Sequence, residues 1–384
     1  GGIVIDLSVM DDVLEVYEED LVAVVSPGIL TAAIHKAAEE KGLMYPPDPS
    51  SSHVSTIGGN LAENSGGPRG LKYGVTKDYV IGLEVITLEG DLIQTGGKTV
   101  KNVTGYDLTK LLVGSEGTLG IITKATLRLL PKPLGTATLM VVFSTLVDAG
   151  KAISKILSSG ILPSKMELMD QASIVAVENY QPMGLPTDVE AIVLLELDGH
   201  PLALKEEIQS VEQLCYSVGA TKVQIPQNDA EKEEIWKARK LVSPAIVRIK
   251  PTKISEDATV PRSKIPEMCE RLQQIKQTYN VDLVVFGHAG DGNLHPNIIC
   301  DKNDAEEMAR VEKAVAEIFT AAVELGGTLS GEHGIGTMKA PFMEMELGQV
   351  GLDMMKRIKQ AWDPNNIMNP GKIFPEPGQK LELK

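Results

Sequence analysis

The sequence predicts a two-domain protein of the α+β class, and three features lead to that prediction. The chain has 384 residues, which is too long for one ordinary hydrophobic core. Strand-type and helix-type hydrophobic patterns alternate along most of its length. Pro131-Lys132-Pro133 interrupts this alternation and marks a domain boundary.

The first domain is expected to begin with strands over residues 3–9 and 21–26, followed by a helix after Pro27-Gly28. Residues 46–70 hold two Gly-Gly pairs and no periodic pattern, so we expect loop throughout. So long a loop in a compact domain is usually functional. The remaining elements are a hairpin around Glu89-Gly90-Asp91, a helix near residues 106–113 and a strand over 120–130.

The second domain alternates strands and helices in a pattern that predicts an antiparallel sheet covered by helices. The expected strands lie near residues 137–143, 165–169, 191–198, 221–225, 256–260, 282–288 and 293–299. The expected helices lie near residues 145–159, 172–180, 202–218, 228–247, 262–279, 304–325 and, as a pair, 339–361. Asn303 and Glu306 are expected to form a capping box for the helix over 304–325.

The composition is that of a globular protein and argues against several function classes. A formal net charge of −15 disfavours nucleic acid or an anionic membrane surface as the main partner. The sequence has no run of eighteen apolar residues that would span a membrane. Cys215, Cys269 and Cys300 form no Cys-x-x-Cys pair, which indicates a reducing compartment and no disulfide framework or iron–sulfur site. The opening GGIVIDLSVM has neither an initiating Met nor a signal peptide, so we take the chain as a fragment.

GHAGDGNLH, residues 287–295, carries two of the six histidines around a tight turn. Asp291-Gly292 predicts a two-residue hairpin loop, which would place His288 directly opposite His295 with Cβ atoms roughly 5 Å apart. Two imidazoles at that separation suit one divalent ion, and Glu332 in SGEHGIG is the natural third ligand. Such a set favours zinc, manganese or iron in a catalytic site. The alternative is that both histidines are hydrogen-bonded packing residues.

His333, next to Glu332, is the better candidate for a general base. The ordinary pKa of an imidazole lies near neutral pH, and a nearby cation lowers it further. The alternative is a loop histidine that is hydrogen-bonded to the backbone.

The glycine-rich stretch STIGGNLAENSGG, residues 55–67, lacks both the GxGxxG and the GxxxxGK[ST] patterns. Its backbone N–H groups, hydroxyls and asparagine side chains could wrap a pyrophosphate or the polar edge of a flavin. A purely structural glycine loop is the alternative.

Several long motifs, in this order and spacing, resemble those of the FAD-linked D-2-hydroxy-acid dehydrogenases. They are STIGGNLAENSGGPRGLKYGVTKDYVIGLEV, GGKTVKNVTGYDLTKLLVGSEGTLGIIT, GHAGDGNLHP, SGEHGIG and NPGKI. This family includes glycolate oxidase flavoprotein subunits and the D-lactate and D-2-hydroxyglutarate dehydrogenases, and it has the vanillyl-alcohol-oxidase flavin fold. The resemblance covers essentially the whole chain. It implies an FAD-binding domain over residues 1–131, an α/β cap domain with the substrate site over 132–362, and a C-terminal segment over 363–384 that returns to the flavin.

The resemblance implies two cofactors, FAD and a divalent metal such as Zn, Mn or Fe. The positions that match its flavin and pyrophosphate contacts are Ser55, Thr56, Gly58, Gly59, Asn60, Ser65, Gly66, Gly67, Gly120, Ile122 and Asn369. His288, His295 and Glu332 match its metal ligands, and the two histidines also border the substrate.

For the reaction, the resemblance implies that a small D-2-hydroxy acid is oxidised to the 2-oxo acid, with hydride passing to flavin N5. His333 matches the family's base, and Asn297 matches a substrate-side position. Arg239 matches the arginine that holds the substrate carboxylate, a role suited to a bidentate guanidinium. Electrons would pass to a partner subunit, an iron–sulfur protein or an electron-transfer flavoprotein. The implied location is the cytoplasm, peripheral to a membrane through that partner.

Two departures from the family pattern stand out. The family's glycine-rich phosphate loop precedes the strand with which this sequence opens, and it is absent here. The 2-hydroxyglutarate enzymes place a lysine two residues before the aspartate of a DxxxP segment. In DATVP of this chain that position is Ser255, with Lys250 and Lys253 close by, which favours a monocarboxylate such as glycolate or D-lactate.

Two other functions remain open on the sequence. A non-catalytic scaffold subunit that has lost FAD would account for the missing phosphate loop, but not for the presence of His288, His295, Glu332 and His333. A flavin-free metallohydrolase would use the metal set, but it leaves the glycine loops and Asn369 without a role.

Overall fold

The computed structural model describes residues 2–376, 378–379, 381 and 383, and the chain forms two compact units. The first unit contains Gly1–Arg69, Tyr73–Lys132 and Glu332–Gln379, and the second contains Gly70–Lys72, Pro133–Gly331 and Lys380–Lys384. The change at Lys132–Pro133 falls at the proline-rich boundary. The next change falls at Gly331–Glu332 and not at 362–363, because the last long helix packs with the first unit. Trp362 contacts the first unit's core, and Lys359 Nζ donates to the Thr118 carbonyl at 2.8 Å.

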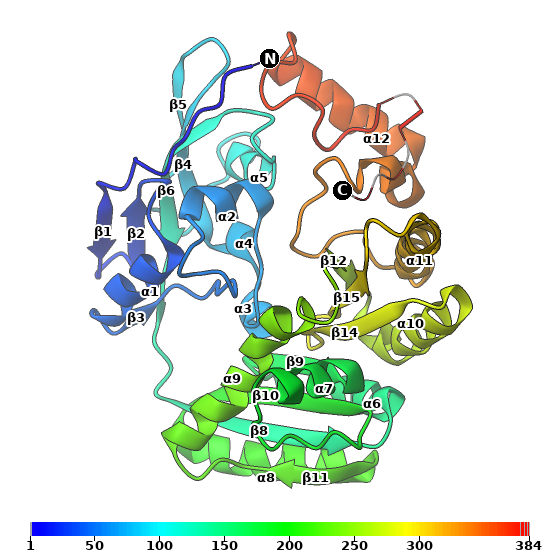
Figure 1. Ribbon diagram of the computed structural model, residues 1–384. Coiled ribbons are helices and arrows are strands. Elements are labelled where there is room, and N and C mark those ends of the chain that lie inside the picture. Colours follow the sequence, from blue (N-terminus) through cyan, green and yellow to red (C-terminus); the bar gives the residue numbers. More distant parts are fainter. Residues whose placement is uncertain (1, 377, 380, 382, 384) are drawn as a thin grey trace. The chain divides into compact units, whose positions relative to one another are not determined.

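The first unit is built on a five-stranded sheet in the order β1-β2-β6-β4-β5, in which every neighbouring pair is antiparallel (Figure 1). Its strands are β1 (Leu14–Tyr17), β2 (Val22–Val25), β4 (Val80–Ile86), β5 (Leu92–Gly96) and β6 (Ile121–Arg128), with β3 (Leu43–Met44) and β7 (Leu130–Pro131) as a separate pair. Its helices are α1 (Thr31–Glu39), α2 (Ile57–Glu63), α4 (Thr76–Tyr79), α5 (Leu108–Leu112) and α12 (Met343–Trp362), while α3 (Gly70–Tyr73) spans the change of unit.

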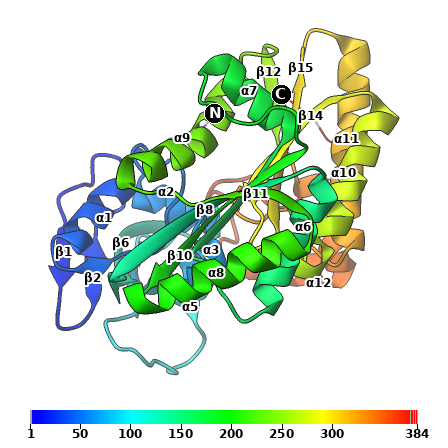
Figure 2. The same cartoon turned by 90° about the horizontal axis from the view of Figure 1, so that it is seen from below.

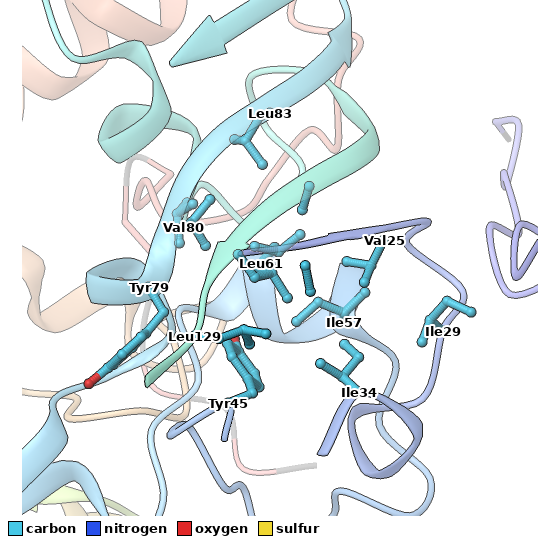
Figure 3. Close-up of a cluster of buried hydrophobic side chains, with 14 of the residues drawn as sticks. Val25, Ile29, Ile34, Tyr45, Ile57, Leu61, Tyr79, Val80, Leu83 and Leu129 are labelled. Atoms are coloured by element: carbon cyan, nitrogen blue, oxygen red, sulfur yellow. The ribbon is translucent and has the colours of Figure 1, made fainter. Parts of the chain in front are cut away.

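The core of the first unit lies between this sheet and the helices α1 and α2 (Figure 3). Ile34 of α1 and Ile57 and Leu61 of α2 are fully buried, as is Leu127 of β6. Burial of a side chain of this size stabilises the fold by about 1.5–3 kcal/mol. The apolar spacing of α2 therefore fixes the part of the glycine-rich stretch that it contains.

Two expectations for the first unit are wrong. Residues 3–9 form no strand, and Ile3 and Val4 are 93% and 95% exposed, because no strand among the described residues pairs with them. The segment over 46–70 is not loop throughout, because α2 lies within it. Thr56 caps α2 by accepting a hydrogen bond from the Gly59 amide, and Ile57 and Leu61, four residues apart, bury one face. That burial outweighs the helix cost of two glycines, about 1 kcal/mol each.

The second unit is an antiparallel sheet in the order β11-β8-β10-β9-β14-β15-β12, and β13 also pairs with β15. Its strands are β8 (Gly135–Phe143), β9 (Lys165–Asp170), β10 (Ala191–Gly199), β11 (Ala220–Gln224), β12 (Thr252–Ser255), β13 (Ala258–Thr259), β14 (Asp282–His288) and β15 (Asn293–Cys300). Its helices are α6 (Leu146–Ser158), α7 (Gln171–Tyr180), α8 (Pro201–Ser217), α9 (Asp229–Ile246), α10 (Ile265–Tyr279) and α11 (Ala305–Glu324). In Figure 2, α7 and α9 lie on one side of the sheet, and α6 and α8 on the other.

The α+β class and the antiparallel sheet are confirmed, with local corrections. The expected strand over 256–260 is reduced to β13, and β12, which was not expected, precedes it. Asp304, not Asn303, caps α11, because its carboxylate accepts hydrogen bonds from the Glu306 and Glu307 amides, each at 3.0 Å. The expected helix pair over 339–361 is confirmed, because α12 consists of two helical segments that meet at a kink at Gly348, where φ is +64°, and a short 3₁₀ turn, Ala340–Phe342, precedes it. No helix in the described part of the chain is long and apolar enough to cross a membrane.

Asp170 joins β9 to β14, which are paired only at Phe286–Met169 and Gly287–Leu168. Its two carboxylate oxygens accept hydrogen bonds from the Ser173 amide at 2.8 Å and from the Val285 amide at 2.9 Å. The carboxylate thereby caps α7 and extends the strand pairing beyond the backbone ladder. Burial outweighs these hydrogen bonds and raises the pKa of Asp170 to about 6.

We expect Asp170 to make stability pH-dependent. Because its folded pKa lies above the unfolded value of 3.8, the folded state holds a proton that the unfolded state has released between these values. Its contribution is therefore present at low pH and lost as the pH rises to about 6, by up to about 3 kcal/mol. Urea unfolding between pH 4 and 7 should show this loss in the wild type relative to Asp170→Asn. Asp304→Asn, at an exposed cap, is the control, and parallel pH curves for wild type and Asp170→Asn would contradict the expectation.

Candidate functional site

The histidine hairpin has a different register from the expected one. His288 pairs with Asn293 and His295 pairs with Phe286, so the direct pairing of His288 with His295 is wrong. The loop has four residues, 289–292, and it is closed by a hydrogen bond from the Gly292 amide to the Ala289 carbonyl at 3.3 Å. The register differs by two residues, and a shift of two keeps every side chain on the same face of a sheet. The two histidines are therefore diagonal neighbours on one face.

The two predicted histidine ligands come together in the second unit. The rings of His288 and His295 have centroids 4.9 Å apart and are almost perpendicular, and the two residues are only 4% and 5% exposed. Glu332, the third predicted ligand, is the first residue of the segment that belongs again to the first unit. Glu332 follows Gly331 directly, and the Gly331 amide donates a hydrogen bond to Asp257 at 2.9 Å. Two buried histidines at this separation fit two ligands of a divalent transition-metal ion, to which a carboxylate is a suitable third.

Glu167, in the middle of β9, is a site residue that the sequence analysis missed. Its side chain is fully buried and accepts hydrogen bonds from His288 Nδ1 at 2.6 Å and from Arg239 Nε at 2.7 Å. Burial alone would raise the pKa of Glu167, but the charges of His288 and Arg239 outweigh it and lower the pKa to about 2. When His288 is neutral, its Nδ1 carries the proton that it donates to Glu167, and Nε2 then has the lone pair that a metal needs. The available signal was an acidic residue between apolar ones in the strand KMELMD.

Arg239 and Asn297 lie beside these groups. Arg239 stands on α9, with its guanidinium carbon 4.7 Å from the centroid of the Phe286 ring. Its Nε is held by Glu167, and its two terminal nitrogens have no protein acceptor in the described chain. Asn297 is fully buried and donates from Nδ2 to the His295 carbonyl at 2.8 Å. Its Oδ1 is buried without a hydrogen-bond partner among the described residues, which is the state of a group that awaits a ligand or water.

Ser255 and Lys253 occupy the same sheet face, because Ser255 pairs with Asn297 and Lys253 with Ile299. The Lys253 ammonium donates to the Ser243 hydroxyl at 3.1 Å, and burial lowers its pKa. Lys250 differs, since it forms ion pairs with Asp282 and Glu307, each at 2.7 Å. The small Ser255 side chain therefore leaves no cation at the position where the 2-hydroxyglutarate enzymes would have one.

Several predicted flavin contacts serve first to shape their own loop. Asn60 is buried and donates to the Thr31 hydroxyl at 2.7 Å, and the Ser55 and Thr31 hydroxyls lie 3.3 Å apart. The Ser65 carbonyl accepts the Thr76 hydroxyl at 2.8 Å. Glycine is required at two of the other positions, because a Cβ would lie 2.8 Å from Pro27 at Gly58, and 2.5 Å from the Asp48 carbonyl at Gly67.

Three predicted flavin contacts, Asn369, Gly120 and Ile122, lie outside this stretch. Asn369 contacts the turn that follows α5, which also packs on α2. Gly114 and Glu116 donate their amides to the Leu61 and Ala62 carbonyls at 2.8 and 2.9 Å. Asn369 donates from Nδ2 to the Glu116 carbonyl. Two further members of this set lie at β6: Ile122 pairs with Val85, and a Cβ at Gly120 would lie 2.7 Å from the Val85 side chain.

An exposed backbone edge remains at the start of α2. Gly59 is exposed, and a Cβ there would meet only the Thr56 hydroxyl, at 3.6 Å. Gly66 lets the Glu332 carboxylate approach the backbone closely, because a Cβ at Gly66 would lie 2.7 Å from Glu332 Oε2. Unobstructed backbone, as at Gly59, fits the polar edge of a flavin.

Comparison with known families agrees with these loops. Residues 132–373 match the family described as FAD linked oxidases, C-terminal domain, and residues 1–96 match the family described as FAD binding domain. The chain belongs to the FAD-linked oxidases. It is therefore an FAD-linked oxidoreductase, as the sequence motifs implied.

Curated relatives of this FAD-linked oxidase cover nearly all of it. The glycolate oxidase subunit GlcD of Bacillus subtilis is 49% identical over 99% of this chain and 81% of its own length. The protein of the same name in Escherichia coli K12 is 38% identical over 97% of this chain and 75% of its own. The D-lactate dehydrogenase of Archaeoglobus fulgidus is 35% identical over 97% and 81%.

Solved structures support the fold. p-Cresol methylhydroxylase superposes with a TM-score of 0.77 at 17% identity, over 96% of this chain and 79% of the other. Alkyldihydroxyacetonephosphate synthase does so with a TM-score of 0.69 at 20% identity, over 95% and 67%. The predicted vanillyl-alcohol-oxidase type of fold is confirmed.

Glu167→Gln should weaken metal binding at the histidine pair. An amide retains the shape but has one acceptor oxygen, so it no longer fixes the tautomer of His288 while holding Arg239. We expect the affinity for Zn²⁺ or Mn²⁺ to fall about 10- to 100-fold in calorimetric titrations of metal-stripped protein. Glu196→Gln is a matched control, because Glu196 is a buried carboxylate on β10 that pairs with Lys165 and Lys232. Equal metal affinities in both variants would show that Glu167 does not support a metal site.

Proposed function

We propose that this FAD-linked oxidase oxidises a small D-2-hydroxy acid, glycolate or D-lactate, to the 2-oxo acid with the help of a divalent metal. The observation that carries the proposal is the buried Glu167 carboxylate, which links the carboxylate-binding candidate Arg239 to the metal-ligand candidate His288. The names of the relatives, glycolate oxidase subunit and D-lactate dehydrogenase, support the substrate class. The serine at position 255 supports a monocarboxylate.

Substrate binding begins with the two terminal nitrogens of Arg239, which form a bidentate pair with the substrate carboxylate. Glu167 orients the guanidinium through Nε, and Phe286 supports its plane, so few rotamers are lost on binding. The buried Oδ1 of Asn297 accepts a hydrogen bond from a ligand donor on the same face of the sheet. His288, His295 and Glu332 hold the metal, which supplies Lewis-acid stabilisation of the developing alkoxide when bound.

The oxidation removes two electrons and two protons from the substrate, as one proton from the hydroxyl group and one hydride from Cα. His333 accepts the proton of the hydroxyl group, and the Cα–H bond is broken as the C=O bond forms. FAD, when bound, is the acceptor of that hydride. In this proposal Ser55, Thr56, Gly59, Gly66 and Asn369 line the flavin with backbone and side-chain polar groups.

The electrons leave for a partner, which we propose to be an iron–sulfur protein or an electron-transfer flavoprotein. The word subunit in the names of two relatives supports a complex of this kind. All three cysteines, Cys215, Cys269 and Cys300, are buried as free thiols, so this chain offers no clustered thiolates for an iron–sulfur centre.

The first test is an anaerobic visible spectrum of the FAD-loaded protein before and after substrate. Glycolate or D-lactate should bleach the flavin band, and L-lactate, the enantiomer control, should bleach it far more slowly. Loss of colour without oxygen reports reduction of the cofactor itself. A protein that takes up no FAD would favour the scaffold function, and a flavin that no 2-hydroxy acid bleaches would contradict the substrate class.

His333→Ala should separate chemistry from binding. Loss of a general base lowers the rate of its proton transfer by about 10²- to 10⁴-fold, while Arg239 still holds the substrate carboxylate. Stopped-flow reduction at several D-lactate concentrations gives the limiting rate and the substrate dissociation constant separately. His200→Ala, at the exposed cap of α8, is the control. Equal losses of rate and binding would contradict the base role.

A further inference from the structure

The segment that carries His333 has little structure of its own. Residues 332–336 form no helix or strand, and Gly334 and Gly336 have φ of +75° and +54°. Left-handed glycines leave the chain many alternative paths, so the position of a base on this segment must be fixed by contacts from elsewhere. Within the first unit, two of the hydrogen bonds that fix it come from Glu116, in the turn after α5.

Glu116 holds this segment through both oxygens of its carboxylate. Oε1 accepts a hydrogen bond from the Ile335 amide at 2.7 Å, and Oε2 accepts one from the Gly336 amide at 2.8 Å. Glu116 is 8% exposed, so these charge-assisted hydrogen bonds are shielded from water. They lie two and three residues after His333 in the chain.

The backbone of Glu116 is itself held in an unusual conformation. Its φ is +50°, in the left-handed region that costs a residue with a side chain about 1–2 kcal/mol. Its amide donates to the Ala62 carbonyl at the end of α2, and its carbonyl accepts from Asn369 Nδ2. Strain of this kind persists only where neighbouring contacts over-determine it, and it is concentrated at functional sites. One residue thus joins the flavin loop, the tail and the His333 segment.

The fit at Gly334 shows how closely the segment is held. A Cβ at this residue would lie 2.0 Å from Glu63 Oε2 and 3.1 Å from Glu116 Oε1. The residue directly after His333 therefore lies against both carboxylates, and its φ of +75° also disfavours a side chain there. A small displacement of the Glu116 carboxylate would move the segment on which His333 stands.

We propose that Glu116 is a positioning residue for His333 and that it sets the rate of the proton transfer without touching the substrate. This inference rests on the proposed role of His333. A displacement of about 1 Å in a reacting group costs about 10²-fold in rate, whereas the affinity for the substrate depends on Arg239. The expected signature is therefore a loss of rate at constant substrate affinity.

Glu116→Gln is the sharpest change, because it keeps the shape of the side chain. The amide has one acceptor oxygen, and its NH₂ group would face a backbone N–H, so one of the two hydrogen bonds is lost. Glu178→Gln is a matched control. Glu178 lies in the second unit and likewise accepts two backbone amides of a loop, those of Met183 at 2.9 Å and Leu185 at 2.8 Å.

The experiment measures anaerobic flavin reduction by D-lactate in FAD-loaded wild type, Glu116→Gln, Glu178→Gln, His333→Ala and the double variant of Glu116 and His333. We expect Glu116→Gln to lower the limiting rate about 10- to 100-fold. The substrate dissociation constant and the flavin spectrum should stay as in the wild type, and Glu178→Gln should reduce at the wild-type rate. In the His333→Ala background, Glu116→Gln should cause no further loss, because a positioning residue acts only through the group that it positions.

Three results would overturn the inference. A wild-type rate in Glu116→Gln would show that the carboxylate is not needed, and an equal further loss in the double variant would show that it acts independently of His333. Loss of FAD from Glu116→Gln would show that the residue holds the cofactor loops and not the base. If His333→Ala itself reduces at the wild-type rate, the proposed function fails at the base, whatever Glu116→Gln does.

Discussion

The site depends first on one buried ionised group, the Glu167 carboxylate. An uncompensated charge in the middle of a sheet would cost several kcal/mol, and this one is stable only because Arg239 and His288 both donate to it. The dependence is mutual. Arg239 lies only 11% exposed, and without Glu167 its guanidinium would be the uncompensated charge. Two residues more than 40 positions apart in sequence are thereby fixed to one strand residue.

The pairing of β9 with β14 and the packing of α9 position the Glu167 carboxylate beside its two donors. Glu167 stands on β9 two residues before Met169, which pairs with Phe286 of β14, so all three side chains lie on one face. α9 supplies Arg239 to that face, while Val242 and Ile246 of the same helix pack into the apolar cluster that contains Phe286. Asp170, the next-but-two residue after Glu167, ties β9 to β14 where the backbone pairing stops. Packing thus positions the charged groups, and the charged groups satisfy one another.

Most of the architecture could be predicted from the sequence because its elements bury long apolar patterns. The strands and helices of the second unit lie within a few residues of their expected places. The wrong predictions concern segments where the spacing of apolar residues does not distinguish a strand, a helix and a loop. Val4, Ile5 and Leu7 suggested a strand, but residues 3–9 have no ladder partner among the described residues. α2 was missed because two glycines suggested a loop, although Ile57 and Leu61 were four residues apart.

The site was predictable in its residue types and not in its connections. Short motifs indicated His288, His295 and Glu332, and the structure places the rings of the two histidines 4.9 Å apart between their centroids. Glu167 was not indicated, because a glutamate in an apolar strand has meaning only once its donors on α9 and β14 are known. Glu116 was hidden for the same reason, since its partners Ile335 and Gly336 lie more than 200 residues away.

The predicted register of the hairpin was wrong, but the prediction that His288 and His295 lie on one face of the sheet was correct. The loop is two residues longer than expected, so His288 faces Asn293 instead of His295. A shift of one residue would have sent one histidine to the opposite face of the sheet, and no shared ligand would have been possible. A shift of two kept both rings on the face of Glu167 and placed their centroids 4.9 Å apart. Parity along the strand, more than the type of turn, therefore decides whether this pair can share an ion, and parity was the part that the sequence spacing could predict.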